Sequence, residues 1–213
     1  MDKRAPHIAT VREQPIGKRG YHHGNLRAAL VNATRDLLAA RGPQGFTLAD
    51  AARKAGVSAA APYRHFTDRD ALMRAVANEG FILFGKRIFT ATSEHCDPRE
   101  ALAAMARAYL GFARTEPGYY AAMFAFPKGD EALPDEEHDA AFKLLISTIT
   151  SILAERRLPE QAAGPLAFRI WSLSHGVATL DAIGHLEYSA MSAEQILVDG
   201  AMALLAAAGQ PPE

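Results

Sequence analysis

Three consecutive side chains in the N-terminal third can bind a polyanion: Tyr63, Arg64 and His65. A phenol and an imidazole can hydrogen-bond to phosphate oxygens, and a guanidinium can bind a guanine edge or a phosphate. The segment before them, Ala59–Ala61, has small side chains that allow close approach to a groove and contact with thymine methyl groups. These residue types predict contact with DNA, although Tyr63 also fits ordinary helix packing.

A second set of residues has the types that bind metals or act as nucleophiles. Asp181 and His185 are four residues apart, a spacing that places both on one helix face and can hold a metal ion. His175 falls on another face, however, and Asp181 with His185 also fits a surface pair. Cys96 follows His95 directly, and adjacent loop residues do not orient as nucleophile and base. No P-loop, Gly-x-Ser-x-Gly motif or dinucleotide fingerprint occurs. We expect no enzyme activity, no cofactor and no metal site, and keep as an alternative a helical small-molecule-binding or metal-dependent protein that does not bind DNA.

Aromatic and methionine side chains are concentrated between residues 109 and 142, where they can line an apolar cavity. Trp171 and His175 are one helical turn apart and share a face. All of these side chains also fit an ordinary core. The candidate ligand-binding residues are Tyr109, Phe112, Tyr120, Met123, Phe124, Phe142, Trp171 and His175.

The elements that must position these groups belong to a 213-residue chain with an uneven charge distribution. Residues 1–66 contain 11 Lys and Arg against 4 Asp and Glu, whereas residues 67–213 contain 12 against 20. A basic third on an acidic body favours a polyanion partner for that third. With one cysteine, no membrane-length apolar run and no apolar core in its first 20 residues, the chain is expected to be cytoplasmic and independent of membranes.

The apolar periodicity predicts an all-α protein of about nine helices after a disordered basic arm, residues 1–20. Asn25, Thr47, Ser58, Asp97 and Ser192 are N-cap candidates, with Thr67 or Asp68 as a further one, and glycines or prolines follow several helix ends. The expected helices cover residues 25–41, 48–55, 59–65, 68–92, 97–116, 117–126, 135–157, 160–186 and 193–208.

The stretch TLADAARKAGVSAAAPYRHFTDRDAL, residues 47–72, predicts two short helices joined by a tight turn at Gly56. This is the helix-turn-helix plan, in which the second helix lies in the DNA major groove. The linked spacing of the Gly-Val-Ser turn, the Tyr-x-His-Phe group and the basic residue before Leu72 resembles the TetR-type transcriptional regulators. YHHGNLR, which begins at Tyr21, together with Trp171, His175 and Gly176, resembles the subgroup with a Trp-His-Gly signature. Pro62 departs from the family pattern, in which an aliphatic residue is usual, and is expected to shorten or tilt the recognition helix.

The resemblance implies a DNA-binding domain at residues 21–80 and a ligand-binding and dimerisation domain at 81–213. It also implies a homodimer formed through the last two helices, a small-molecule effector, and a double-stranded operator with two half-sites. The implied function is a ligand-responsive repressor that binds a palindromic operator. The implied DNA-binding residues are Lys18, Arg19, His22, Thr47, Ser58, Ala59, Ala60, Tyr63, Arg64, His65 and Arg69.

Overall fold

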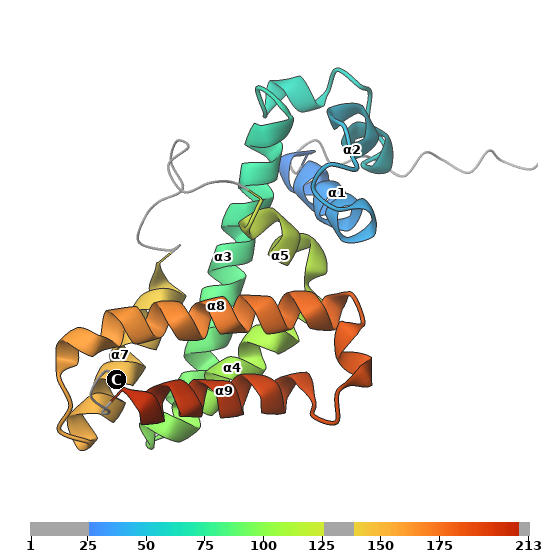
Figure 1. Cartoon of the computed structure of the whole chain (residues 1–213). Coiled ribbons are helices and arrows are strands. Elements are labelled where there is room, and N and C mark those ends of the chain that lie inside the picture. Colours follow the sequence, from blue (N-terminus) through green and yellow to red (C-terminus); the bar gives the residue numbers. More distant parts are fainter. Residues whose placement is uncertain (1–25, 126–138, 209–213) are drawn as a thin grey trace, which may run out of the picture.

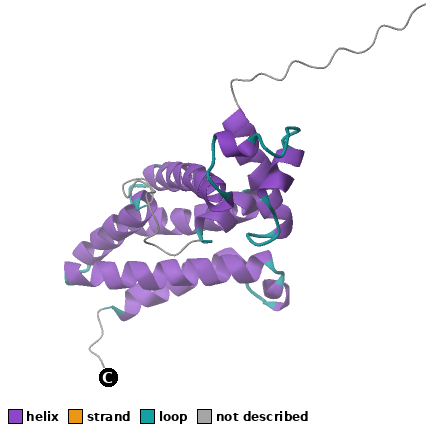
Figure 2. Cartoon of the chain, turned by 90° about the horizontal axis from the view of Figure 1, so that it is seen from above, coloured by secondary structure: helices purple, strands orange, loops and turns teal. Residues whose placement is uncertain are grey.

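The computed structural model describes residues 26–125 and 139–208, and this part of the chain is helical without strands, as the sequence predicts (Figure 2). The predicted arm and the N-cap at Asn25 lie outside the described residues. The α-helices are α1 (Leu26–Arg41), α2 (Leu48–Lys54), α3 (Arg69–Ser93), α4 (Pro98–Thr115), α5 (Pro117–Met123), α7 (Ala140–Glu155), α8 (Ala163–Ala182) and α9 (Ala193–Ala207). The 3-10 helices are η1 (Pro62–Arg64), η2 (Glu160–Ala162) and η3 (His185–Tyr188).

Several helices begin at the capping residues that the sequence indicates. Thr47 and Ser192 form capping boxes at the starts of α2 and α9. Asp68 caps α3 by accepting from the Ala71 N–H at 2.7 Å, and Asp97 caps α4 in the same manner. These side chains accept hydrogen bonds from N–H groups that have no partner within the helix, which explains why the helix starts could be predicted closely.

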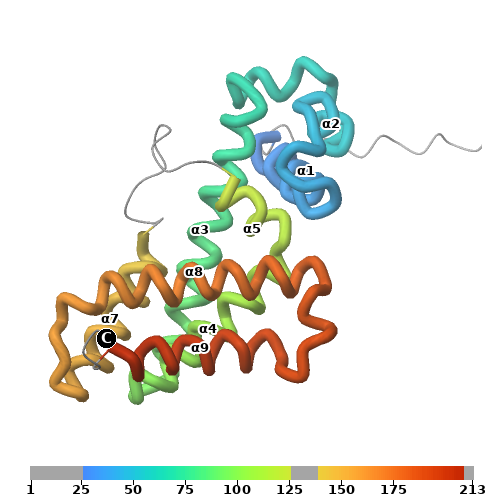
Figure 3. Tube along the Cα trace, in the orientation of Figure 1, coloured from blue at the N-terminus to red at the C-terminus, as the bar shows by residue number. Residues whose placement is uncertain are grey.

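The 25-residue helix α3 connects the two parts of the molecule (Figure 1). Its N-terminal half packs with α1, which in turn contacts α2, while its C-terminal half packs with α4 and α7. The short helix α5 packs against α1 and α3 between the two parts, and α8 and α9 run side by side (Figures 1 and 3). The expected domain boundary at residue 80 therefore falls inside one continuous helix.

The helix predicted at Ala59–His65 is wrong. The chain there forms turns followed by the single 3-10 turn of η1, and Ser58 caps no α-helix. Pro62 has no N–H to donate to the Ser58 carbonyl, which instead accepts from the Ala61 N–H at 2.9 Å. The ring of Pro62 is buried, so this turn is fixed by packing as well as by the missing donor.

The helix predicted at residues 160–186 is divided into three. Its start is the 3-10 turn η2, and α8 ends at Ala182. Gly184 then adopts a φ of 74°, in the left-handed region that glycine tolerates, and η3 follows in a new direction. Asp181 and His185 consequently do not share one helix.

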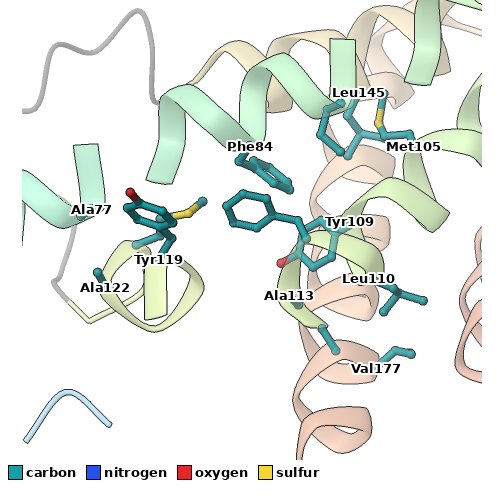
Figure 4. Close-up of a cluster of buried hydrophobic side chains, with 14 of the residues drawn as sticks. Ala77, Phe84, Met105, Tyr109, Leu110, Ala113, Tyr119, Ala122, Leu145 and Val177 are labelled. Carbon is teal, nitrogen blue, oxygen red and sulfur yellow. The ribbon is translucent and has the colours of Figure 1, made fainter. Parts of the chain in front are cut away.

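One buried cluster of apolar side chains extends from α1 to α9. Phe112, Leu110 and Ile149 are among its largest fully buried members. Figure 4 shows its centre, where Phe84 of α3 lies against Tyr109 of α4, with ring centroids 5.4 Å apart. Within the described ranges, none of the helices is both long and apolar enough to cross a bilayer.

Candidate functional site

The turn around η1 presents its polar side chains to solvent. Pro62 and Phe66 are both buried, and Phe66 belongs to the apolar core. Tyr63 is 63% exposed, so helix packing does not account for it. The side chains that share this exposed surface with Tyr63 are Ser58, Ala59, Ala60, Arg64 and His65, and we call these six residues the turn surface.

The side chain of Arg64 has no ion-pair or hydrogen-bond partner among the described residues. Other arginines of this end of the molecule are neutralised locally: Arg53 pairs with Asp50, and Arg35 pairs with Asp36 at 2.8 Å. The charge of Arg64 is therefore available to an external anion.

Thr47 is exposed, but its polar groups bond to Asp50. Its N–H donates to Asp50 Oδ2 at 3.0 Å, and its hydroxyl donates to the same oxygen at 2.7 Å. These bonds lower the pKa of Asp50, with the bond from the Thr47 side chain as the largest cause. A phosphate bound by Thr47 would have to replace part of this capping box.

Arg69 lies at the start of α3 and is held by the preceding loop. Its Nε donates to the Phe46 carbonyl at 3.2 Å, its Nη2 donates to the Pro43 carbonyl, and its guanidinium lies 4.6 Å from the Phe46 ring centroid. Nη1 also pairs with Asp70 at 2.9 Å. Arg69 thus fixes the α1–α2 connection against α3. The remaining predicted DNA-binding residues, Lys18, Arg19 and His22, lie outside the described residues.

A second group of polar and aromatic side chains lies in the lower part of the molecule. Six partly exposed rings from α5, α7 and α8 touch one another in a chain, and we call them the ring cluster: Tyr120, Phe124, Phe142, Phe168, Trp171 and His175. Tyr109, fully buried on α4, lies 6.1 Å from Tyr120 by ring centroids. This arrangement brings six of the eight predicted ligand-binding residues into one contact network.

The other two predicted ligand-binding residues, Phe112 and Met123, are buried outside the ring cluster. Phe112 packs on Phe84, 5.2 Å between ring centroids. Met123 packs on α3 at Gly80, where an added Cβ would lie 3.0 Å from the Met123 sulfur. Phe84 and Phe168 were missed by sequence reasoning, although Phe168 precedes Trp171 by three residues, a spacing that places both on one helix face.

Hydrogen bonds link the ring cluster to the core. Tyr120 Oη lies 2.8 Å from His175 Nδ1, and Tyr109 Oη lies 3.3 Å from Tyr120 Oη. Burial lowers the pKa of His175 and raises the pKa values of Tyr120 and Tyr109. Burial therefore favours the neutral form of all three groups, and their polar atoms form one hydrogen-bonded set.

Helix α5 faces this cluster on one side and α1 on the other. Tyr120 belongs to the ring cluster, whereas its neighbour Tyr119 lies under the Arg35 guanidinium, 5.6 Å from ring centroid to Cζ, and donates to Glu79 at 3.3 Å. Gly118 approaches α1 so closely that an added Cβ would lie 2.1 Å from the Arg35 carbonyl oxygen. One short helix thus contacts both the ring cluster and α1, the first helix of the N-terminal part.

The alternative metal-binding helix is not formed. Asp181 pairs with Arg114 at 2.7 Å, and the break at Gly184 separates it from His185. Within residues 26–125 and 139–208, no three His, Cys, Asp or Glu side chains gather as metal ligands would.

Comparisons with known proteins match two parts of the chain to one family and agree with the helical fold. The model of the bacterial regulatory proteins of the tetR family matches residues 30–76, which include α2 and the turn surface. The model of the tetracyclin repressor-like C-terminal domain matches residues 102–205, which include the ring cluster. This chain is a TetR-type transcriptional regulator. The narrower Trp-His-Gly subgroup stays a prediction.

This TetR-type regulator is also similar to individual proteins and solved structures. An uncharacterised HTH-type transcriptional regulator of Mycobacterium tuberculosis is 25% identical over 164 residues, 76% of this chain and 72% of the relative. A solved structure of a protein of unknown function from Rhodococcus sp. RHA1 is 30% identical, with a TM-score of 0.75 over 91% of this chain and 100% of that chain. A TetR-like transcriptional regulator from the same organism has the same fold at 19% identity, with a TM-score of 0.63 over 87% and 98% of the two chains.

Proposed function

We propose that this regulator is a ligand-responsive homodimeric repressor of a palindromic operator, with no enzymatic activity, and that it works in the cytoplasm. Residues 21–80 bind DNA, and residues 81–213 bind the effector and form the dimer. The observation that supports the DNA contact most directly is the turn surface, where Tyr63, Arg64 and His65 are exposed beside the buried Pro62 and Phe66.

Within this proposal the residues have distinct roles. Ala59, Ala60 and Arg64 face base edges, while Tyr63 and His65 contact phosphates. Thr47 and Ser58 contribute polar groups near the backbone, and Arg69 holds the loop that presents them. The arm residues Lys18, Arg19 and His22 reach an adjacent groove or phosphate.

The dimer forms through α8 and α9. Ser172, Gly176, Thr179 and Ile183 share one exposed face of α8, and no atom lies within 4 Å of a Cβ added at Gly176. The neighbouring exposed side of α9 has small side chains at Ala203 and Ala206. Small side chains allow two such helix pairs to approach closely, and the two-fold symmetry places two turn surfaces on successive half-sites, roughly 34 Å apart.

The effector binds at the ring cluster and changes the separation of the turn surfaces. Helices α3 and α5 both connect this region to the turn surface side of the molecule. An effector that binds more tightly to the separation of turn surfaces that does not match the operator lowers operator affinity. The ratio of the effector's affinities for the two separations sets the size of this decrease. Saturation of the ring cluster with unchanged operator affinity would contradict this part of the proposal.

The test is selection from a genomic fragment library at two salt concentrations, with sequencing of the bound fragments. We expect enrichment of a palindromic site and weaker binding at higher salt, because phosphate contacts release counterions. The matched control is Arg64→Ala combined with Tyr63→Ala, which should enrich nothing above background. If the wild type binds no duplex at either salt concentration, the proposed function is rejected.

A further inference from the structure

The chemistry of the ring cluster restricts the kind of molecule that it can accept, an inference that rests on the proposed effector role. Trp171 is 37% exposed and Phe168 57% exposed, although both are large apolar side chains. They continue through Phe142 and Phe124 to the half-buried Tyr120 and His175. An aromatic molecule can stack on these ring faces or meet them edge-on.

One hydrogen-bond donor of the cluster has no acceptor. With the His175 ring proton on Nε2, Nδ1 accepts from Tyr120 and Tyr120 accepts from Tyr109, so this tautomer gives both hydroxyl protons an acceptor. Among the described residues, the bonds of the His175 side chain are those of Nδ1 with the two tyrosine hydroxyls. The two ring nitrogens face different directions, and the Nε2–H therefore donates away from the tyrosines. A ligand acceptor at this position would complete the chain that begins at Tyr109.

The cluster contains no ionised side chain. Arg114, an α4 cation that contacts α8, is already paired with Asp181 and Glu194. Lys143 and Arg169, which follow Phe142 and Phe168 in the sequence, are exposed to solvent. A carboxylate or an ammonium placed against these rings would lose hydration without gaining a counter-ion, which is unfavourable.

We propose that the effector is a neutral planar aromatic molecule with one hydrogen-bond acceptor, such as an aryl ketone or ester. Its ring lies against Trp171 and Phe124, and its carbonyl oxygen accepts from His175 Nε2–H. The two neutral tyrosines hold the imidazole in the tautomer that this bond requires.

The test uses the full chain and the fact that Trp171 is its single tryptophan. Three probes are compared by saturable quenching of Trp171 emission and by calorimetry: acetophenone, ethylbenzene and benzoate. We expect acetophenone to bind about tenfold more tightly than ethylbenzene, the ratio that one satisfied donor can give. Benzoate should bind more weakly than acetophenone, because its charge has no partner.

Two variants locate the effect. His175→Phe retains an aromatic ring but removes the imidazole N–H donor. Acetophenone and ethylbenzene should then bind this variant with about equal affinity. The matched control is His185→Phe, an exposed histidine on η3 outside the ring cluster, which should retain the preference.

The ligand class is overturned if benzoate binds as tightly as acetophenone, if no probe quenches saturably, or if His175→Phe retains the preference. A Trp171 emission maximum that shifts with protein concentration would show instead that a second copy covers the cluster, and would also overturn it. The operator selection needs no ligand, so DNA binding without aromatic binding rejects the ligand class alone. Aromatic binding without DNA binding rejects the proposed function alone.

Discussion

Arg64 and Arg69 are five residues apart, yet their guanidinium groups have different surroundings. Arg64 is exposed and has no partner among the described residues, whereas Arg69 bonds to the carbonyls of Pro43 and Phe46 and stacks on the Phe46 ring. In the family pattern Arg69 is the basic residue before Leu72, whereas Arg64 occupies the variable position between Tyr63 and His65. The structure separates a charge that is available to a phosphate from one that is used to hold a loop.

We expect Arg64→Ala to weaken operator binding with stability changed by less than about 0.5 kcal/mol, because it removes an exposed charge. Arg69→Ala should lower the free energy of unfolding by about 1–3 kcal/mol, since two bonded carbonyls lose a charged donor. Fluorescence anisotropy on an operator fragment and urea unfolding measure the two effects. Arg107→Ala, an exposed α4 variant, is the control, and equal stability losses at residues 64 and 69 would contradict the distinction.

His175 predicts a pH dependence of stability whose sign follows from burial. Burial lowers its pKa below the ordinary 6.5, so the unfolded chain takes up this proton at a higher pH than the folded chain. The contribution is fully present above pH 6.5 and is lost as the pH falls toward the folded-state value, by at most about 1.4 kcal/mol per pH unit. Urea unfolding of the wild type and His175→Phe between pH 7.5 and 5 should show the smaller decline in the variant. An identical decline in both proteins would contradict this.

At the scale of elements, the sequence predicted the helix starts well but did not predict every position at which a helix is interrupted. Thr47, Asp97 and Ser192 act through residues two or three positions away, and such local bonds are encoded in short sequence patterns. Pro62 marked a possible distortion, but whether the segment remained α-helical depended on burial of its ring. Gly184 can occupy a helix or a left-handed turn, and the sequence pattern did not show that it takes the left-handed turn.

The sequence predicts the residues of the candidate sites where they form one continuous motif, but not where their contacts join distant parts of the chain. The residues of the turn surface follow from one contiguous motif, and they could be named from the sequence. The contacts of Arg69 with Pro43 and of Tyr120 with His175 join residues 26 and 55 positions apart, so periodicity could not reveal them. Which aromatic residues form the ring cluster and which are plain core was likewise decided by helix packing.

Helix α5 offers a test of how the two parts are joined. Gly118→Ala would place a Cβ 2.1 Å from the Arg35 carbonyl oxygen, so α5 or α1 must shift. We expect the free energy of unfolding to fall by about 1–3 kcal/mol. Gly164→Ala in α8 has nothing within 4 Å of the new Cβ and should leave stability unchanged or raise it by up to about 1 kcal/mol. Urea unfolding compares the variants, and equal effects would show that the close approach of α5 to α1 is unimportant.

At the scale of the whole molecule, the charge distribution and the exposed faces of α8 indicate that different surfaces serve DNA, the effector and a second copy. The surplus of seven positive charges in residues 1–66 coincides with the part that holds the turn surface, while the acidic remainder includes the faces of α8 and α9. On α8, Trp171 and His175 belong to the ring cluster, whereas Ser172, Gly176 and Thr179 lie on a face exposed to solvent. One helix can therefore serve an effector and a second copy without competition between them.

The dimer prediction can be tested without disturbing the monomer, because the proposed α8 face has room for new side chains. Gly176→Arg places a long cation where no atom lies within 4 Å of the new Cβ, so the monomer should fold. Two such cations would meet across a two-fold axis, and we expect the dimer to dissociate at concentrations at which the wild type remains dimeric. Operator affinity should fall in parallel, because each monomer then binds one half-site. Sedimentation equilibrium and anisotropy measure both effects. Thr90→Arg, on an exposed face of α3, is the control, and a Gly176→Arg protein that stays dimeric would place the interface elsewhere.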